Sequence, residues 1–62
     1  MAATDALERF ISSLPERERT TLRSTIQKCR TDLFAARSED ARQRLVEAFI
    51  LHAHKLLEQE NL

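Results

Sequence analysis

The chain has 62 residues with no glycine, one proline and one cysteine, and its ten basic side chains balance its ten acidic ones. Without glycine it lacks the phosphate-binding loops of P-loop and dinucleotide-binding proteins, and a single cysteine excludes an internal disulfide. Leu, Ala, Arg and Glu dominate the composition, and because these residues favour helices the sequence predicts an all-α fold.

The length predicts one small domain, residues 1–62. A chain of this size buries only about 60% of its unfolded surface, so association with another chain is the expected way to stabilise it. The amino terminus lacks a basic segment followed by an apolar run, and no apolar run is longer than four residues, such as Ala48 to Leu51. We therefore expect a cytoplasmic protein with no membrane contact.

The first predicted helix covers about residues 5–13. Asp5 and Glu8 have the spacing of a capping box. An apolar stripe at helical spacing follows them, made of Leu7, Phe10, Ile11 and Leu14. A helix this short needs tertiary packing to persist.

The segment from Ser13 to Glu16 predicts a corner, followed by a second helix over about residues 16–37. It reads S-x-x-E, a capping box, with Pro15 in the first turn, where its missing N–H costs nothing. A residue before proline is disfavoured in the α conformation, so the first helix should end here. The second helix carries a two-heptad apolar seam made of Leu22, Ile26, Cys29, Leu33 and Ala36.

The stretch from Leu7 to Arg23 resembles the start of the C-terminal promoter-binding domain of bacterial sigma factors, in which a short apolar helix leads into an LPERER turn. The residues that match are Leu14 to Arg19 and Leu22. That family reads DNA with a later helix-turn-helix whose turn contains glycine, and no such segment follows in this sequence. We therefore interpret the motif as a helix corner.

The seam breaks near Ser38, because its continuation would place Asp40 and Gln43 in the core. Ser38 can cap a new helix, and acidic residues after it favour the first turn. The third predicted helix, about residues 39–58, has a wide apolar face suited to two neighbours. That face consists of Leu45, Phe49, His52 and Leu56, flanked by Val46, Ile50, Ala53 and Leu57.

One alternative is a single helix over residues 16–58, because no strong helix breaker lies between Ala35 and Arg42. The two seams would then lie about 180° apart, since nine residues separate Ala36 from Leu45. A reversal at Arg37 to Glu39 brings them together. The predicted fold is thus a short N-terminal helix followed by a long antiparallel helical hairpin, which we expect to dimerise into a helical bundle.

No catalytic, cofactor-binding or metal site is predicted, and we expect a non-enzyme. His52 and His54 are two residues apart, which places them on opposite sides of a helix, whereas a zinc-binding helix spaces its ligands at i and i+4. Cys29 lies in an apolar seam, where a thiol has a raised pKa and low reactivity.

The sequence instead predicts a helical protein–protein interaction module, a small regulator or adaptor that acts as a homo-oligomer and binds another protein. The predicted interface consists of Leu22, Ile26, Cys29, Leu33, Phe34, Leu45, Phe49, Ile50, Ala53 and Leu57. The alternative is a regulator that binds RNA or DNA through an arginine-rich face of the second helix, with residues at seven-residue spacing: Arg23, Arg30, Arg37 and Arg44.

Overall fold

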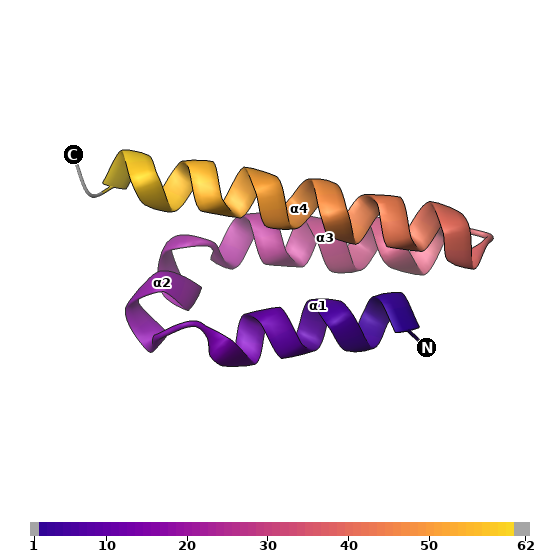
Figure 1. Cartoon of the computed structure of the whole chain (residues 1–62), viewed down its shortest axis with the longest axis horizontal. Coiled ribbons are helices and arrows are strands. Elements are labelled where there is room, and N and C mark those ends of the chain that lie inside the picture. The colour runs from indigo at the N-terminus through magenta and orange to yellow at the C-terminus, as the bar shows by residue number, and fades with distance from the viewer. Residues whose placement is uncertain (1, 61–62) are drawn as a thin grey trace.

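The computed structural model describes residues 2–60, which form four α-helices: α1 (Ala2–Ser13), α2 (Glu16–Thr21), α3 (Arg23–Ala35) and α4 (Glu39–Glu60). The all-α prediction is confirmed for these residues. The fold is an elongated bundle of 37 × 17 × 15 Å, in which α1, α3 and α4 lie along the long axis and α2 crosses one end (Figure 1). None of the helices in residues 2–60 has the length and apolar character needed to cross a bilayer.

The first helix begins at Ala2, three residues before the predicted start. The reason is a tertiary contact: the Ala3 backbone N–H donates to Glu39 Oε2, the atoms being 2.8 Å apart. The first N–H groups of a helix lack partners within it, so this carboxylate from α4 acts as a cap that local sequence patterns do not contain.

The corner between α1 and α2 lies where it was predicted, but its hydrogen bonds differ. Ser13 Oγ donates to the Phe10 carbonyl at 2.7 Å and so turns back onto α1. The residue before α2 is Pro15, in an extended conformation, and no side chain caps this helix. The predicted capping box from Ser13 to Glu16 is therefore wrong, although the proline still separates the two helices.

The predicted helix over residues 16–37 is divided at Leu22 and ends at Ala35. Leu22 lies at φ −94° and ψ 8°, and its side chain is fully buried. Just before it, the hydroxyls of Thr20 and Thr21 donate to the carbonyls of Glu16 and Arg17 at 3.0 and 3.1 Å. Such bonds back to the preceding turn bend helices, which explains the angle between α2 and α3.

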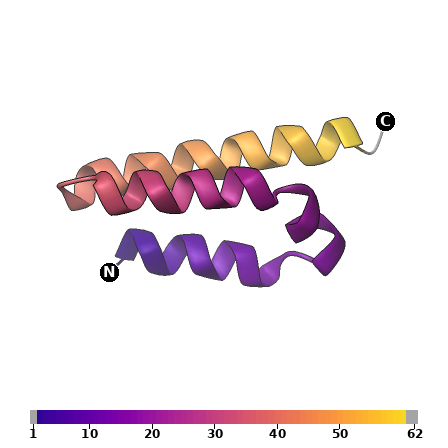
Figure 2. The same ribbon diagram turned by 180° about the vertical axis from the view of Figure 1, so that it is seen from behind.

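Residues 36–38 link α3 to α4, so the alternative of one unbroken helix is wrong. Ala36 is extended, and Ser38 Oγ accepts a hydrogen bond from the Ala41 N–H at 3.1 Å, as predicted for a cap. Arg42 Nη2 also donates to the Ala36 carbonyl at 3.1 Å. The view from behind shows α4 returning alongside α3 (Figure 2).

The core lies where α4 packs against both α1 and α3. Its ten buried residues are Ala3, Leu7, Ile11, Leu22, Ile26, Cys29, Leu33, Val46, Phe49 and Ala53. The Phe10 and Phe49 rings meet edge to face, with centroids 5.8 Å apart. The wide apolar face of α4 thus has two neighbours within the same chain.

Candidate protein-binding groove

The site with the most binding potential is a groove between α1 and α3, here called the α1–α3 groove. Both helices pack against α4, but they approach each other much less closely. Phe34 and the polar and charged side chains along their facing sides are exposed or half-buried, whereas the aliphatic side chains between them are buried. The groove has two parts, which share Arg30 and Phe34.

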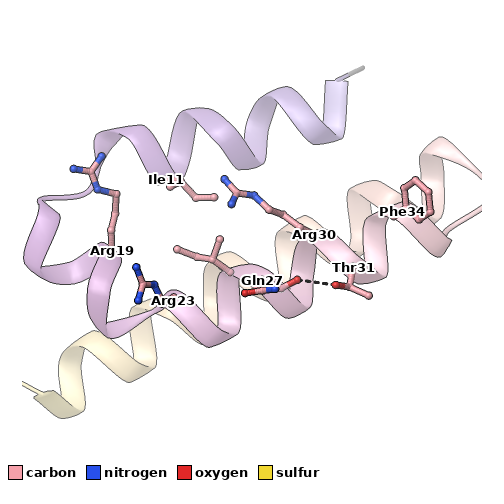
Figure 3. A pocket seen from close by; sticks show the side chains of 8 residues that line it. Ile11, Arg19, Arg23, Gln27, Arg30, Thr31 and Phe34 are labelled. Carbon is pink, nitrogen blue, oxygen red and sulfur yellow. Dashed lines mark hydrogen bonds between the residues drawn. The ribbon is translucent and has the colours of Figure 1, made fainter.

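The part nearer α2 is basic, with a volume of about 700 Å³. Its lining residues are Ile11, Arg19, Arg23, Ile26, Gln27, Arg30, Thr31 and Phe34. Figure 3 shows Ile11 projecting from α1 toward the arginines of α2 and α3. Three guanidinium groups thus surround an aliphatic floor, and no carboxylate lines this part.

The part nearer the N-terminus of α1 has mixed charge, with Thr4, Leu7, Glu8, Arg30, Leu33, Phe34, Glu39 and Arg42 around it. An ion pair separates the two parts. Arg30 Nε and Nη2 donate to the two carboxylate oxygens of Glu8 at 3.1 and 2.9 Å. This hydrogen bond to Glu8 is the main reason that the pKa of Arg30 is raised above its ordinary value, and the guanidinium stays charged.

Phe34 occupies the boundary of both parts with 93% of its side chain exposed. Leu51, on α4, is the other large apolar side chain in residues 2–60 that is strongly exposed, at 66%. Leu51 lines neither part of the groove. Phe34 therefore differs from a single scattered apolar residue, because it continues an apolar groove.

The ten residues predicted as a protein interface fall into three sets. Six lie inside the fold: Leu22, Ile26, Cys29, Leu33, Phe49 and Ala53. Three are half-buried against the core: Leu45, Ile50 and Leu57. Phe34 alone of the ten is exposed. Phe49, on the wide apolar face of α4, packs against Phe10 of α1 within the chain.

The four arginines predicted for nucleic acid do not form one row. Arg23 and Arg30 line the α1–α3 groove, whereas Arg37 lies beyond the end of α3. Arg44 lies on α4 and pairs with Asp40 at 3.2 Å. The seven-residue spacing is interrupted by the link at residues 36–38. Arg19, which lies four residues before Arg23 and therefore near the same face in the sequence pattern, completes the basic part of the groove.

No metal centre or reactive thiol emerges from residues 2–60. They contain no group of three potential His, Cys, Asp or Glu ligands. His52, predicted on the apolar face, is exposed, and the ring of His54 meets Phe10 edge to face at 5.7 Å. Burial raises the pKa of the Cys29 thiol, and the charge of Asp32 raises it further. That thiol is therefore a poor nucleophile.

Comparisons with protein-family models, with curated proteins and with solved structures found no match to this chain. Function is therefore inferred from the residues of the groove.

Proposed function

We propose that the chain is a non-enzymatic protein–protein interaction module, a small regulator or adaptor that binds through the α1–α3 groove. The observation that supports this function best is the 93% exposure of Phe34 beside a groove floored by Ile11 and Ile26. Aromatic residues and arginines that surround an apolar pocket are the residue types that dominate binding energy at protein interfaces. An apolar groove with a polar rim is also typical of interaction sites.

Site-specific photo-crosslinking tests this function. A benzophenone amino acid at position 34 should capture a protein from a nuclease-treated lysate of the source cells, and the matched probe at position 51 should not. Position 51 is a suitable control because Leu51 is exposed but lies outside the groove. Equal capture at the two positions, or capture that nuclease abolishes, would contradict the proposal.

We also propose self-association, as expected from the sequence. With Phe49 and Ala53 inside the fold, the predicted interface residues of α4 left for contact between copies are Leu45, Ile50 and Leu57. Sedimentation equilibrium at micromolar concentration should give the mass of a dimer or higher oligomer. A monomer mass would contradict self-association, and the groove would still be available to another protein.

A second candidate function is nucleic-acid binding, favoured by the three arginines that line the basic part of the groove. Such binding releases counterions, so its affinity should fall by orders of magnitude between about 50 and 200 mM salt if many phosphates are contacted. Recognition of a protein through apolar contacts should change far less. Filter binding of single-stranded RNA over this salt range distinguishes the two functions.

A further inference from the structure

We propose that the α1–α3 groove binds an acidic amphipathic helix of another protein, which completes a four-helix arrangement with α1, α3 and α4. This inference rests on the proposed interaction function and specifies the chemistry of the partner. It follows from three properties of the groove: its length, the unpaired arginines of its basic part, and the like charges that a second copy would bring to that part.

The walls of the groove are two helices of 12 and 13 residues. At 1.5 Å per residue they are about 18–20 Å long, which matches a bound helix of about three turns. The floor is apolar and continues past Arg30 from Ile11 and Ile26 to Leu7 and Leu33. These four residues are at most 8% exposed, so Phe34 supplies the exposed apolar side chain at the edge of the floor. An amphipathic helix can place one apolar stripe on such a floor, with residues at i, i+3, i+4 and i+7 as anchors.

The charge of the groove selects acidic flanks on that helix. No carboxylate of residues 2–60 forms an ion pair with Arg19 or Arg23. Arg30 pairs with Glu8, but both side chains are about half exposed, at 52% and 46%. Exposed pairs contribute little to stability, so Arg30 can exchange Glu8 for a carboxylate of the partner at small cost.

The same charge disfavours a second copy of this chain in the groove. A two-fold contact brings a surface patch against itself, so the patch must be self-complementary. A two-fold axis through the basic part of the groove would bring Arg19, Arg23 and Arg30 of each copy together, since no carboxylate lines that part. Like charges at an interface suppress association.

The surroundings of the arginines favour a helix over a nucleic acid. Aliphatic side chains lie between the guanidinium groups, and Phe34 is the one aromatic ring that lines either part of the groove. Sequence-tolerant binding of single strands uses several aromatic side chains on which successive bases stack. Arg37 and Arg44, which would extend a phosphate track, do not line the groove.

The test uses the full chain and two synthetic helical peptides of about 13 residues, the length of the groove walls. In the first peptide, Leu residues occupy one stripe and Glu residues flank it, and in the second every Glu is Lys. A uridine oligonucleotide serves as the third probe. Fluorescence anisotropy should show binding of the Glu peptide, and binding of the Lys peptide and the oligonucleotide should be weaker by about tenfold or more.

Four variants locate the binding on the protein. Phe34→Ala should weaken binding of the Glu peptide by about tenfold, and the double variant R19E/R23E should weaken it at least as much. The matched controls are Leu51→Ala and Lys28→Glu, whose side chains are exposed but line no part of the groove. Both controls should bind the Glu peptide as the unaltered chain does, and circular dichroism should show that all four variants fold.

Equal binding of the Glu and Lys peptides, or tighter binding of the oligonucleotide, would overturn the acidic helix as the occupant. Failure of the Glu peptide to bind at all, or loss of binding in the two controls, would overturn it too. A dimer that Phe34→Ala or R19E/R23E converts to a monomer would instead identify a second copy as the occupant. In each case, capture of a protein by the position-34 crosslinker would leave the interaction function standing, whereas absence of such capture would remove that function as well.

Discussion

The two long sides of α3 differ in what they contact. One side, centred on Cys29, is buried in the core, and Ile26 and Leu33 at its margin are buried too but also line the floor of the α1–α3 groove. The other carries Arg23, Arg30 and Phe34 and borders the α1–α3 groove. Apolar residues on the first side have partners within the chain, whereas the most apolar residue on the second is the most exposed large apolar side chain of residues 2–60. Stability and recognition therefore depend on different faces of one helix. Substitutions on the buried face should lower stability, and substitutions on the exposed face should weaken binding.

The largest expected difference is between Phe49 and Phe34, which are 5% and 93% exposed. Phe49→Ala removes a ring that packs against Phe10, and should lower the free energy of unfolding by about 3–5 kcal/mol. Phe34→Ala should change it by no more than about 0.5 kcal/mol. Urea unfolding followed by circular dichroism measures both. Similar losses for the two variants would show that Phe34 is part of the core in solution.

A second difference concerns the buried thiol of Cys29, whose pKa burial raises from an ordinary value of 9.0. A raised pKa in the folded state means that the unfolded chain loses the thiol proton first. Stability is therefore fully present below pH 9 and falls as the pH rises from there through the pKa of the folded state, by at most about 1.4 kcal/mol per pH unit. Cys29→Ala removes this ionisation. The unfolding free energy of the variant should therefore fall less over the same pH range than that of the unaltered chain. Parallel alkaline curves for the two proteins would contradict the prediction.

The two serines at the helix junctions give the next largest difference. Ser38 Oγ accepts the Ala41 N–H and caps α4, whereas Ser13 Oγ bonds back to Phe10 in α1. Ser38→Ala should therefore cost about 1 kcal/mol of unfolding free energy. Ser13→Ala should lie within about 0.5 kcal/mol of the unaltered chain, as is usual for an exposed position without a cap. Thermal and urea unfolding measure both variants. A larger loss of unfolding free energy for Ser13→Ala than for Ser38→Ala would indicate that Ser13 caps α2, as the sequence predicts.

These serines also show how far the sequence predicts the fold. Helical periodicity gave most of the buried positions of the three long helices, because burial follows the period of the helix, but His52 is exposed and Ala3, outside the predicted stripe, is buried. Local patterns missed the cap that Glu39 provides for α1, since those residues are far apart in sequence. They also missed the bend at Leu22, because threonine hydroxyls that bend a helix leave no periodic signal.

The groove was harder to predict than the core. Phe34 was among the expected interface residues, and Arg23 and Arg30 among the alternative ones, and helical spacing places all three on one side of a helix. The sequence does not show that this side stays accessible, because that depends on the separation between α1 and α3, which packing on α4 determines. Six expected interface residues proved to be core, because an apolar face looks the same in sequence whether its partner is internal or external.

The smallest expected effect on stability is at the Glu8–Arg30 pair, which bridges the groove between α1 and α3. Glu8→Gln keeps the size of the side chain and removes its charge. Since both partners are about half exposed, the unfolding free energy should fall by less than about 1 kcal/mol, and the difference should shrink as salt screens the pair.

Removing the charge of Glu8 also frees Arg30 for a carboxylate of the partner, so the Glu peptide should bind to Glu8→Gln about two- to fivefold more tightly than to the unaltered chain. Asp5→Asn is the matched control, because Asp5 is exposed on the same helix and lines neither part of the groove. Weaker peptide binding by Glu8→Gln than by Asp5→Asn would show that Glu8 organises the groove rather than competing for it.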